Sequence, residues 1–292
     1  MGTIIEQTAV VQGAWRSRHS ALRLAVSAAK TCLDRAGRSA NDLDLVLNAG
    51  LYRDRNLGEP ALAALIQEDI GAHPEDPHVD THGTFSFDVA NGTCGVLTAL
   101  QIADGFLRSG AIKHAIIVAS DADPGHGMSD NFPFSATGGA LLCSWADGPG
   151  GMGAASWAAN RDGDALRARI QHERKRNVLH IEESAALDTQ YAETAATAVA
   201  SCLSDAALGL ADIDRIVAAP ARPRFRAVLA EKLGLEPARI TVGAEEWTHT
   251  AALVAALEAS GPRPSAGTRT LVVTAGAGVT AGAALYEEPT RR

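Results

Sequence analysis

The sequence has few cysteines and no cysteine pair of the kind that binds zinc. The cysteines are Cys32, Cys94, Cys143 and Cys202, which stand far apart without any C-x-x-C spacing. Neither a disulfide framework nor a metal site is therefore expected. The longest apolar runs fall far short of the ~18 residues that a membrane helix needs, and the first residues do not resemble a secretory leader. We therefore expect a cytoplasmic protein.

An excess of positive charge is also missing. The chain has 26 basic and 34 acidic residues, a net charge of −8, and only 4% aromatic residues. This excludes a generally basic surface that coats nucleic acid. Small residues are abundant instead, with 57 alanines and 28 glycines among 292 residues. A core of small side chains implies elements that approach one another closely, in one large domain or two compact halves.

Short apolar runs alternate with alanine-rich stretches of helical spacing. The runs that predict buried strands are Leu43–Leu47, Ala115–Ala119, Ile213–Val217 and Leu271–Thr274. The stretches that predict helices are Ala21–Ala36, Leu97–Leu107, Thr194–Leu208, Phe225–Leu233 and Ala251–Ala259. Continuously apolar strands that alternate with helices indicate an α/β protein whose sheets are covered on both faces.

One segment occurs twice. Ser27–Leu47 matches Thr197–Val217 without a gap, including Cys32 with Cys202 and a "D-hydrophobic-D" motif before the strand of each copy. Each copy predicts a helix, a turn and a strand. We interpret the repeat as a duplicated α/β unit, so the protein should consist of two similar halves. The glycine- and proline-rich stretch Asp147–Gly153 is the expected boundary.

The stretch Phe87–Asp121 carries the strongest indication of chemistry. It reads strand, tight glycine turn, helix, turn and strand, with Thr93 and Cys94 where the turn enters the helix. Backbone N–H groups at such a point are unpaired and the helix dipole is positive. A thiol there has a lowered pKa, and a developing oxyanion finds hydrogen-bond donors. The alternative is structural, with Thr93 capping the helix and Cys94 buried.

This stretch resembles the nucleophile segment of β-ketoacyl-ACP synthase III, a family with the thiolase fold. The shared features are FDVA, the glycine of the helix entry and SGAxKxAxxVxSD, at the same spacing. Further resemblances follow in the family's order, at Phe134–Leu142, Asp212–Gly234, Trp247–Leu257 and Thr274–Leu285. The resemblance implies a thiolase-like α/β fold of two similar halves in a layered αβαβα arrangement. The halves would be residues 1–150 and 151–292.

The resemblance breaks down at the catalytic positions. The family's cysteine, histidine and asparagine fall on Thr93, Ala219 and His249, respectively. Cys94 comes one residue late, which turns its side chain by ~100° around a helix. A threonine hydroxyl without a neighbouring base is a poor nucleophile at neutral pH, and Ala219 cannot transfer a proton. The decarboxylative condensation of the family should therefore be lost or strongly reduced.

Some catalytic chemistry could survive. His249 is ionisable and could activate Thr93 or a reoriented Cys94 for simple acyl transfer; the alternative is a buried structural histidine. The family holds the oxyanion with the nucleophile's own N–H and a second N–H near the C-terminus. These positions correspond to Thr93 and Ala277, and backbone donors do not depend on side-chain identity.

The resemblance also implies ligands and partners. No cofactor is expected, but the family's ligands are acyl-phosphopantetheine and coenzyme A thioesters. Much of the segment that recognises them is missing between Val11 and Ser20. A basic cluster, Arg222, Arg224 and Arg226, is expected to dock an acidic acyl carrier protein. A second basic run, Arg167–Arg176, is interpreted as a solvated helix face. The family's dimer contact is expected at Ala115–Asp121, in a homodimer or a heterodimer.

Two functions remain open at this point. The favoured one is a catalytically degenerate subunit that partners an intact, active condensing enzyme in fatty-acid, polyketide or related secondary metabolism. The other is an active acyltransferase or thioesterase that uses Cys94 or Thr93 with His249. Neither a nucleic acid nor a membrane is an expected partner.

Overall fold

The strands build one long mixed sheet and one small one. The computed structural model describes residues 1–15, 17–56, 61–73, 75, 83–161, 166–276 and 278–290. The ten-stranded sheet has the order β11-β10-β12-β13-β7-β1-β6-β4-β2-β3, and the three-stranded sheet has the order β5-β9-β8. The strands are β1 (Gly2–Gln12), β2 (Leu45–Asn48), β3 (Phe85–Asp88), β4 (His114–Asp121), β5 (Ser129–Asp130), β6 (Thr137–Ala146), β7 (Gly151–Ala159), β8 (Leu166–Glu173), β9 (Arg176–Glu183), β10 (Arg215–Ala219), β11 (Ile240–Thr241), β12 (Arg269–Gly276) and β13 (Thr280–Glu287).

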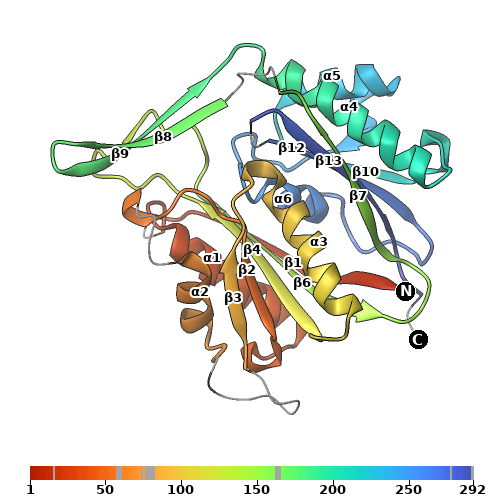
Figure 1. Cartoon of the computed structure of the whole chain (residues 1–292), viewed down its shortest axis with the longest axis horizontal. Coiled ribbons are helices and arrows are strands. Elements are labelled where there is room, and N and C mark those ends of the chain that lie inside the picture. Colours follow the sequence, from red (N-terminus) through yellow and green to blue (C-terminus); the bar gives the residue numbers. More distant parts are fainter. Residues whose placement is uncertain are drawn as a thin grey trace.

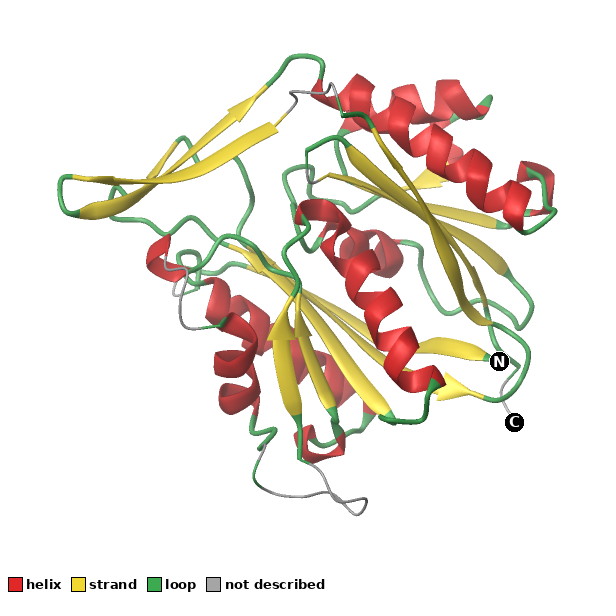
Figure 2. Cartoon of the chain, viewed as in Figure 1, coloured by secondary structure: helices red, strands yellow, loops and turns green. Residues whose placement is uncertain are grey.

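Helices cover the outer faces of the long sheet and also fill the space between its two parts (Figures 1 and 2). The α-helices are α1 (Ala21–Ala36), α2 (Leu62–Ile70), α3 (Gly95–Arg108), α4 (Leu187–Asp205), α5 (Pro223–Leu233) and α6 (Ala252–Ala259). One apolar cluster joins α1 and α2 to the first part of the sheet, and another joins α4 and α5 to the second. The largest cluster joins α3 and α6 to both parts. The layers therefore alternate as αβαβα.

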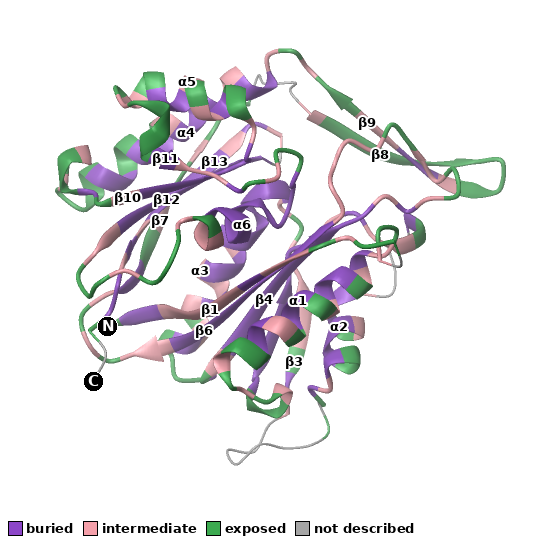
Figure 3. Cartoon of the chain, turned by 180° about the vertical axis from the view of Figure 1, so that it is seen from behind, coloured by how far each residue is buried: buried purple, intermediate pink, exposed green. Residues whose placement is uncertain are grey.

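The burial of β4 explains why its sequence is continuously apolar. Ile116 and Val118 belong to the cluster under α1, whereas Ile117 and Ala119 belong to the central cluster with α3 and α6. All four side chains are fully buried, and Figure 3 shows this part of the sheet as buried throughout. A strand with a helix layer on each face has no solvent side, so the alternation of apolar and polar residues disappears.

The repeated segment forms the same elements and contacts in both places. Asp42 and Asp212 each accept a hydrogen bond of 2.8 Å from the backbone N–H three residues earlier, in a short 3₁₀ turn. Asp214 accepts from the N–H of Arg269, the first residue of β12, at 2.8 Å. Asp44 accepts from the N–H of His114, the first residue of β4, at 3.0 Å. In each copy, the motif thus links its own turn to the first residue of the neighbouring strand in the sheet. The division after residue 150 stays a prediction, since β7 joins β1 in one sheet.

Two sequence expectations are wrong. Ala115–Asp121 cannot extend a sheet into a second molecule, because β4 pairs with β2 on one side and β6 on the other. Among the described residues, the strand at that end of the long sheet is β3, which pairs with β2 alone. The basic run Arg167–Arg176 does not form a helix face either. It lies on β8, β9 and their turn, in a hairpin that projects from the body and is largely exposed (Figures 1 and 3).

Close packing of α1 on the sheet gives the first testable prediction. A Cβ added at Gly138 would lie 2.5 Å from the carbonyl oxygen of Leu24, which is backbone and cannot move aside. We expect Gly138→Ala to lower the free energy of unfolding by about 3 kcal/mol. Gly105, exposed within α3, has no atom within 4 Å of such a Cβ. Gly105→Ala should raise that free energy by ~0.5–1 kcal/mol. Urea denaturation of both variants measures the difference, and similar effects would contradict the packing described.

Candidate functional site

The head of α3 places Thr93 in a pocket. A single 3₁₀ turn, Gly92–Cys94, leads from β3 into α3, and Thr93 is 3% exposed. The Thr274 hydroxyl on β12 donates a hydrogen bond of 2.8 Å to the carbonyl oxygen of Thr93. A Cβ on Gly276 would lie 2.9 Å from the Thr93 Cβ, so the end of β12 can approach this residue only as glycine. Contacts with β12 therefore fix the position of Thr93 at the head of α3.

Cys94 points away from the pocket. Its Sγ lies 3.6 Å from the carbonyl oxygen of Thr280 on β13, and the side chain is fully buried. Burial raises the pKa of the thiol to about 12. Cys94 is not among the pocket-lining residues, whereas Thr93 is. The structure thus separates the two adjacent side chains and leaves the thiol protonated within the core.

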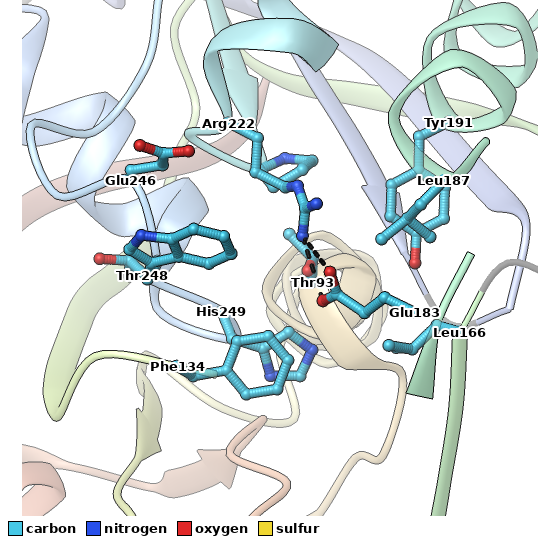
Figure 4. A pocket seen from close by; sticks show the side chains of 12 residues that line it. Thr93, Phe134, Leu166, Glu183, Leu187, Tyr191, Arg222, Glu246, Thr248 and His249 are labelled. Atoms are coloured by element: carbon cyan, nitrogen blue, oxygen red, sulfur yellow. Dashed lines mark hydrogen bonds and ion pairs between the residues drawn. The ribbon is translucent and has the colours of Figure 1, made fainter. Parts of the chain in front are cut away.

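His249 reaches the same pocket from the loop that precedes α6. The ring is 6% exposed, and its Nδ1 lies 3.3 Å from Oδ2 of Asp121. It stacks on Phe134 with ring centroids 4.1 Å apart and on Tyr52 with centroids 5.4 Å apart. Thr93 and His249 both line the pocket, as Figure 4 shows.

Asp121, at the end of β4, is the buried carboxylate that contacts His249. Its Oδ2 accepts hydrogen bonds from the backbone N–H and the hydroxyl of Thr250, at 2.8 and 2.6 Å. Its Oδ1 accepts from the N–H of Tyr52 at 3.2 Å. Burial opposes ionisation, but the charge and hydrogen bond of His249 and the two bonds from Thr250 outweigh it and lower the pKa of Asp121. Sequence reasoning missed this residue, although a polar side chain ending a buried strand was a visible signal.

The pocket is narrow, with a cavity volume of about 20 Å³. Its walls come from the head of α3, the loop before α6, the end of β9 and the start of α4 (Figure 4). The lining residues are Thr93, Phe134, Leu166, Glu183, Leu187, Tyr191, Pro220, Arg222, Glu246, Trp247, Thr248 and His249. Apolar walls with a few convergent polar groups are features of ligand sites, and an organic ligand would require this space to widen.

Arg222 is part of the pocket wall. Its Nη1 lies 2.9 Å from Oε2 of Glu183, its Nε lies 2.6 Å from Oδ1 of Asp188, and its guanidinium carbon lies 5.3 Å from the centre of the Trp247 ring. Burial opposes the positive charge, but the two carboxylates outweigh it and raise the pKa of Arg222. The residue that sequence analysis assigned to a docking surface therefore lies in an ion-pair cluster.

The other two arginines of the basic cluster lie on α5. Arg224 is exposed, and Arg226 donates a hydrogen bond of 2.8 Å to the carbonyl oxygen of Pro237. Docking of a carrier protein by Arg222, Arg224 and Arg226 stays a prediction.

The remaining candidate positions contribute less to the pocket. Ala219 ends β10, is fully buried and offers only a methyl group, and its neighbour Pro220 lines the pocket instead. Ala277, the expected second oxyanion donor, lies outside the described residues. The structure therefore places Thr93 and His249 in one pocket, places Asp121 beside His249 and leaves Cys94 in the core.

Relatives in sequence are β-ketoacyl-ACP synthases III. The protein of that name from Thiobacillus denitrificans is 28% identical over 272 residues, which cover 90% of this chain and 82% of the relative. That from Sphingopyxis alaskensis is 28% identical over 263 residues, covering 85% and 77%. That from Ehrlichia canis is 32% identical over 98 residues, only 34% of this chain and 27% of the relative. No protein-family model matches the chain.

Solved structures of the same class share the fold. The 3-oxoacyl-ACP synthase III of Aquifex aeolicus superposes with a TM-score of 0.78 at 21% identity, covering 98% of this chain and all of that one. The priming β-ketosynthase of a polyketide biosynthetic pathway superposes with a TM-score of 0.79 at 19% identity, covering 100% and 97%. These matches confirm the thiolase-like α/β fold. In the described part of the chain, no helix is long and apolar enough to span a membrane.

Proposed function

We propose that this β-ketoacyl-ACP synthase III-like protein does not itself catalyse decarboxylative condensation and acts as a subunit beside a condensing paralogue. One observation carries the proposal. At the head of α3, the side chain that enters the pocket is the hydroxyl of Thr93, while the only neighbouring thiol, Cys94, is buried against Thr280.

Decarboxylative condensation requires a thiolate nucleophile and hydrogen-bond donors at a second position, and this pocket lacks both. A soft nucleophile must hold the acyl group, and a thiolate serves best because it attacks and leaves readily at neutral pH. Donors must also stabilise the charge that forms on the second thioester as carbon dioxide departs. At the second position, Ala219 presents a methyl group and no donor.

An acyl thioester remains the most suitable ligand. The apolar pocket wall suits an acyl chain, and the fold is that of enzymes whose names include the acyl carrier protein. We propose acyl-phosphopantetheine or a coenzyme A thioester as the ligand, with Arg224 on the exposed side of α5 steering an acidic carrier protein. Among the described residues β3 pairs with β2 alone, and we propose its other edge as the contact with a partner subunit.

The decisive experiment compares the chain alone with the chain co-expressed with a paralogue that retains cysteine, histidine and asparagine. We expect the isolated chain to form no condensation product from an acyl-coenzyme A and a malonyl-carrier protein. The co-expressed pair should purify together, show the mass of a heteromer and form product. Condensation by the isolated chain, at a rate similar to the pair, would overturn the proposal.

A second candidate function is acyl transfer or thioester hydrolysis through Thr93. The observation that favours it is the His249–Asp121 contact beside a hydroxyl at a helix head. Incubation with a radiolabelled acyl thioester distinguishes the two. A covalent acyl group on Thr93 that is lost in His249→Ala supports transfer, and complete absence of label supports a non-catalytic subunit.

A further inference from the structure

We infer that Asp121 is a positioning residue that fixes the tautomer of His249 and makes the ring a proton acceptor for the Thr93 hydroxyl. Thr93, His249 and Asp121 would then form a hydroxyl–imidazole–carboxylate relay for acyl thioesters. The inference rests on the second candidate function and names the residue that would make it work.

The contacts of Asp121 decide which ring nitrogen carries the proton. An ionised carboxylate can only accept hydrogen bonds, so the His249 nitrogen beside it must be a donor. That nitrogen is Nδ1, which lies 3.3 Å from Oδ2 without hydrogen-bond geometry, and the negative charge so close to it disfavours a lone pair there. In a neutral imidazole one nitrogen donates and the other accepts, so Nε2 is left with its lone pair. Asp121 is 1% exposed and has a lowered pKa, and it therefore stays ionised.

The ring has little freedom to adopt another arrangement. Phe134 stacks on it at an interplanar angle of 15° and Tyr52 at 27°. Thr250, the next residue in the chain, is fastened to the same carboxylate by its N–H and its hydroxyl. The carboxylate thus holds both the ring and the backbone that carries it. Flipping the ring would bring the apolar Cδ2 edge towards a buried negative charge.

The relay permits a balanced acyl transfer. The Thr93 oxygen bonds to the carbonyl carbon of the thioester while the hydroxyl proton passes to Nε2 of His249. The carbon–sulfur bond then breaks, and the departing sulfur takes that proton as a thiol. An ester on Thr93 remains. Water attacks the ester by the same route, gives its proton to His249 and releases the carboxylic acid with the threonine restored.

The same geometry explains why such a relay differs from a condensing site. In its neutral form, with the proton on Nδ1, His249 would offer the pocket an acceptor, whereas stabilising a thioester oxygen requires a donor. The pocket would therefore favour removal of a proton from a hydroxyl or water over the build-up of an enolate.

The first test is the tautomer of His249 in the full-length protein. Nitrogen-15 NMR of the histidine side chains, assigned by comparison with His249→Gln, reports which nitrogen is protonated in the neutral ring. We expect the proton on Nδ1 in the wild type and in Thr93→Val. In Asp121→Asn, the amide can donate to Nδ1, and the proton should move to Nε2. A proton on Nε2 in the wild type would refute the inference.

The second test is turnover of octanoyl-coenzyme A, followed by release of free coenzyme A and by the mass of the protein. We expect Asp121→Asn to slow release at least ~100-fold and Thr93→Val to abolish the acyl adduct. Asp88→Asn is the matched control. Asp88 is also a largely buried carboxylate, and it binds Arg53 and Asn48 rather than His249. Its variant should retain the wild-type rate.

Failure of the acyl-transfer function and failure of the positioning role of Asp121 give different results. If the tautomer is as expected and no thioester tested is cleaved, the acyl-transfer function fails and the assignment of Asp121 stands. If thioester is cleaved and Asp121→Asn cleaves it as fast as the wild type, the positioning role is refuted.

Discussion

A Thr93→Cys variant should react with iodoacetamide at neutral pH about three orders of magnitude faster than Cys94 does in the wild type. An ordinary thiol has a pKa of ~8.5, and a helix N-terminus lowers it. Burial raises the pKa of Cys94 to about 12. The difference of roughly 3.5 pKa units corresponds to a thiolate fraction ~10³ times larger at position 93, before access through the pocket is counted. Peptide mass mapping of the labelled protein measures the two rates.

The control for this prediction is Cys94→Ala in the Thr93→Cys background, which should label as fast as the single variant. Cys32, Cys143 and Cys202 should remain unlabelled in both, because all three are buried and burial raises the pKa of each. Rapid alkylation of Cys94 in the native wild-type protein would show that its thiol reaches the pocket. The proposed loss of condensation would then have no basis.

Asp121→Ala should lower the free energy of unfolding by about 3 kcal/mol or more, because it removes a buried carboxylate that accepts three hydrogen bonds. The loss leaves the Thr250 hydroxyl, its N–H and the N–H of Tyr52 without the acceptor they now share. Urea denaturation at neutral pH measures the effect. Glu258→Ala is the comparison, since it breaks an ion pair with Arg35 whose side chains are 35% and 43% exposed. That variant should lose less than ~1 kcal/mol.

The stabilising effect of Asp121 should also disappear in acid. Its pKa in the folded protein is lowered, so its contribution is fully present above the unfolded pKa of ~3.9 and is lost as the pH falls through the folded pKa. The difference in the free energy of unfolding between the wild type and Asp121→Ala should therefore be constant around neutral pH and should decrease below ~4. A gap that widens in acid would show that Asp121 is protonated in the native protein.

Much of the fold was predictable because its helices have clear ends. The prediction of Ala21–Ala36 matches α1, which Ser20 caps at its start and Gly37, at a φ of 64°, ends. The long strands β1, β6, β7 and β13 were not assigned from sequence. β7 and β13 are rich in glycine and alanine, which have little strand preference of their own, and these two strands form because they pair with each other. The projecting hairpin was mistaken for a helix because charged residues dominate both kinds of exposed surface.

The site was predictable only where a motif fixed the register. Counting along the nucleophile segment placed Thr93 at the head of a helix, and the structure lines the pocket with it. The partners of buried charges could not be counted in that way. Asp121 and His249 are 128 residues apart in sequence but 3.3 Å apart in space. Arg222 was assigned to the surface because most arginines are exposed, and its pairing with Glu183 depends on where β9 ends.

The position of β1 in the sheet affects how the chain can assemble during synthesis. Its partner along most of its length is β6, and Gly2 lies opposite Ala146 in that pairing. β1 thus lies inside the sheet, and it has no pairing partner until β6, which ends at Ala146, has been synthesised. Such distant pairing makes folding slow and leaves an apolar segment uncovered meanwhile, so chaperone capture of nascent chains should be concentrated in this interval.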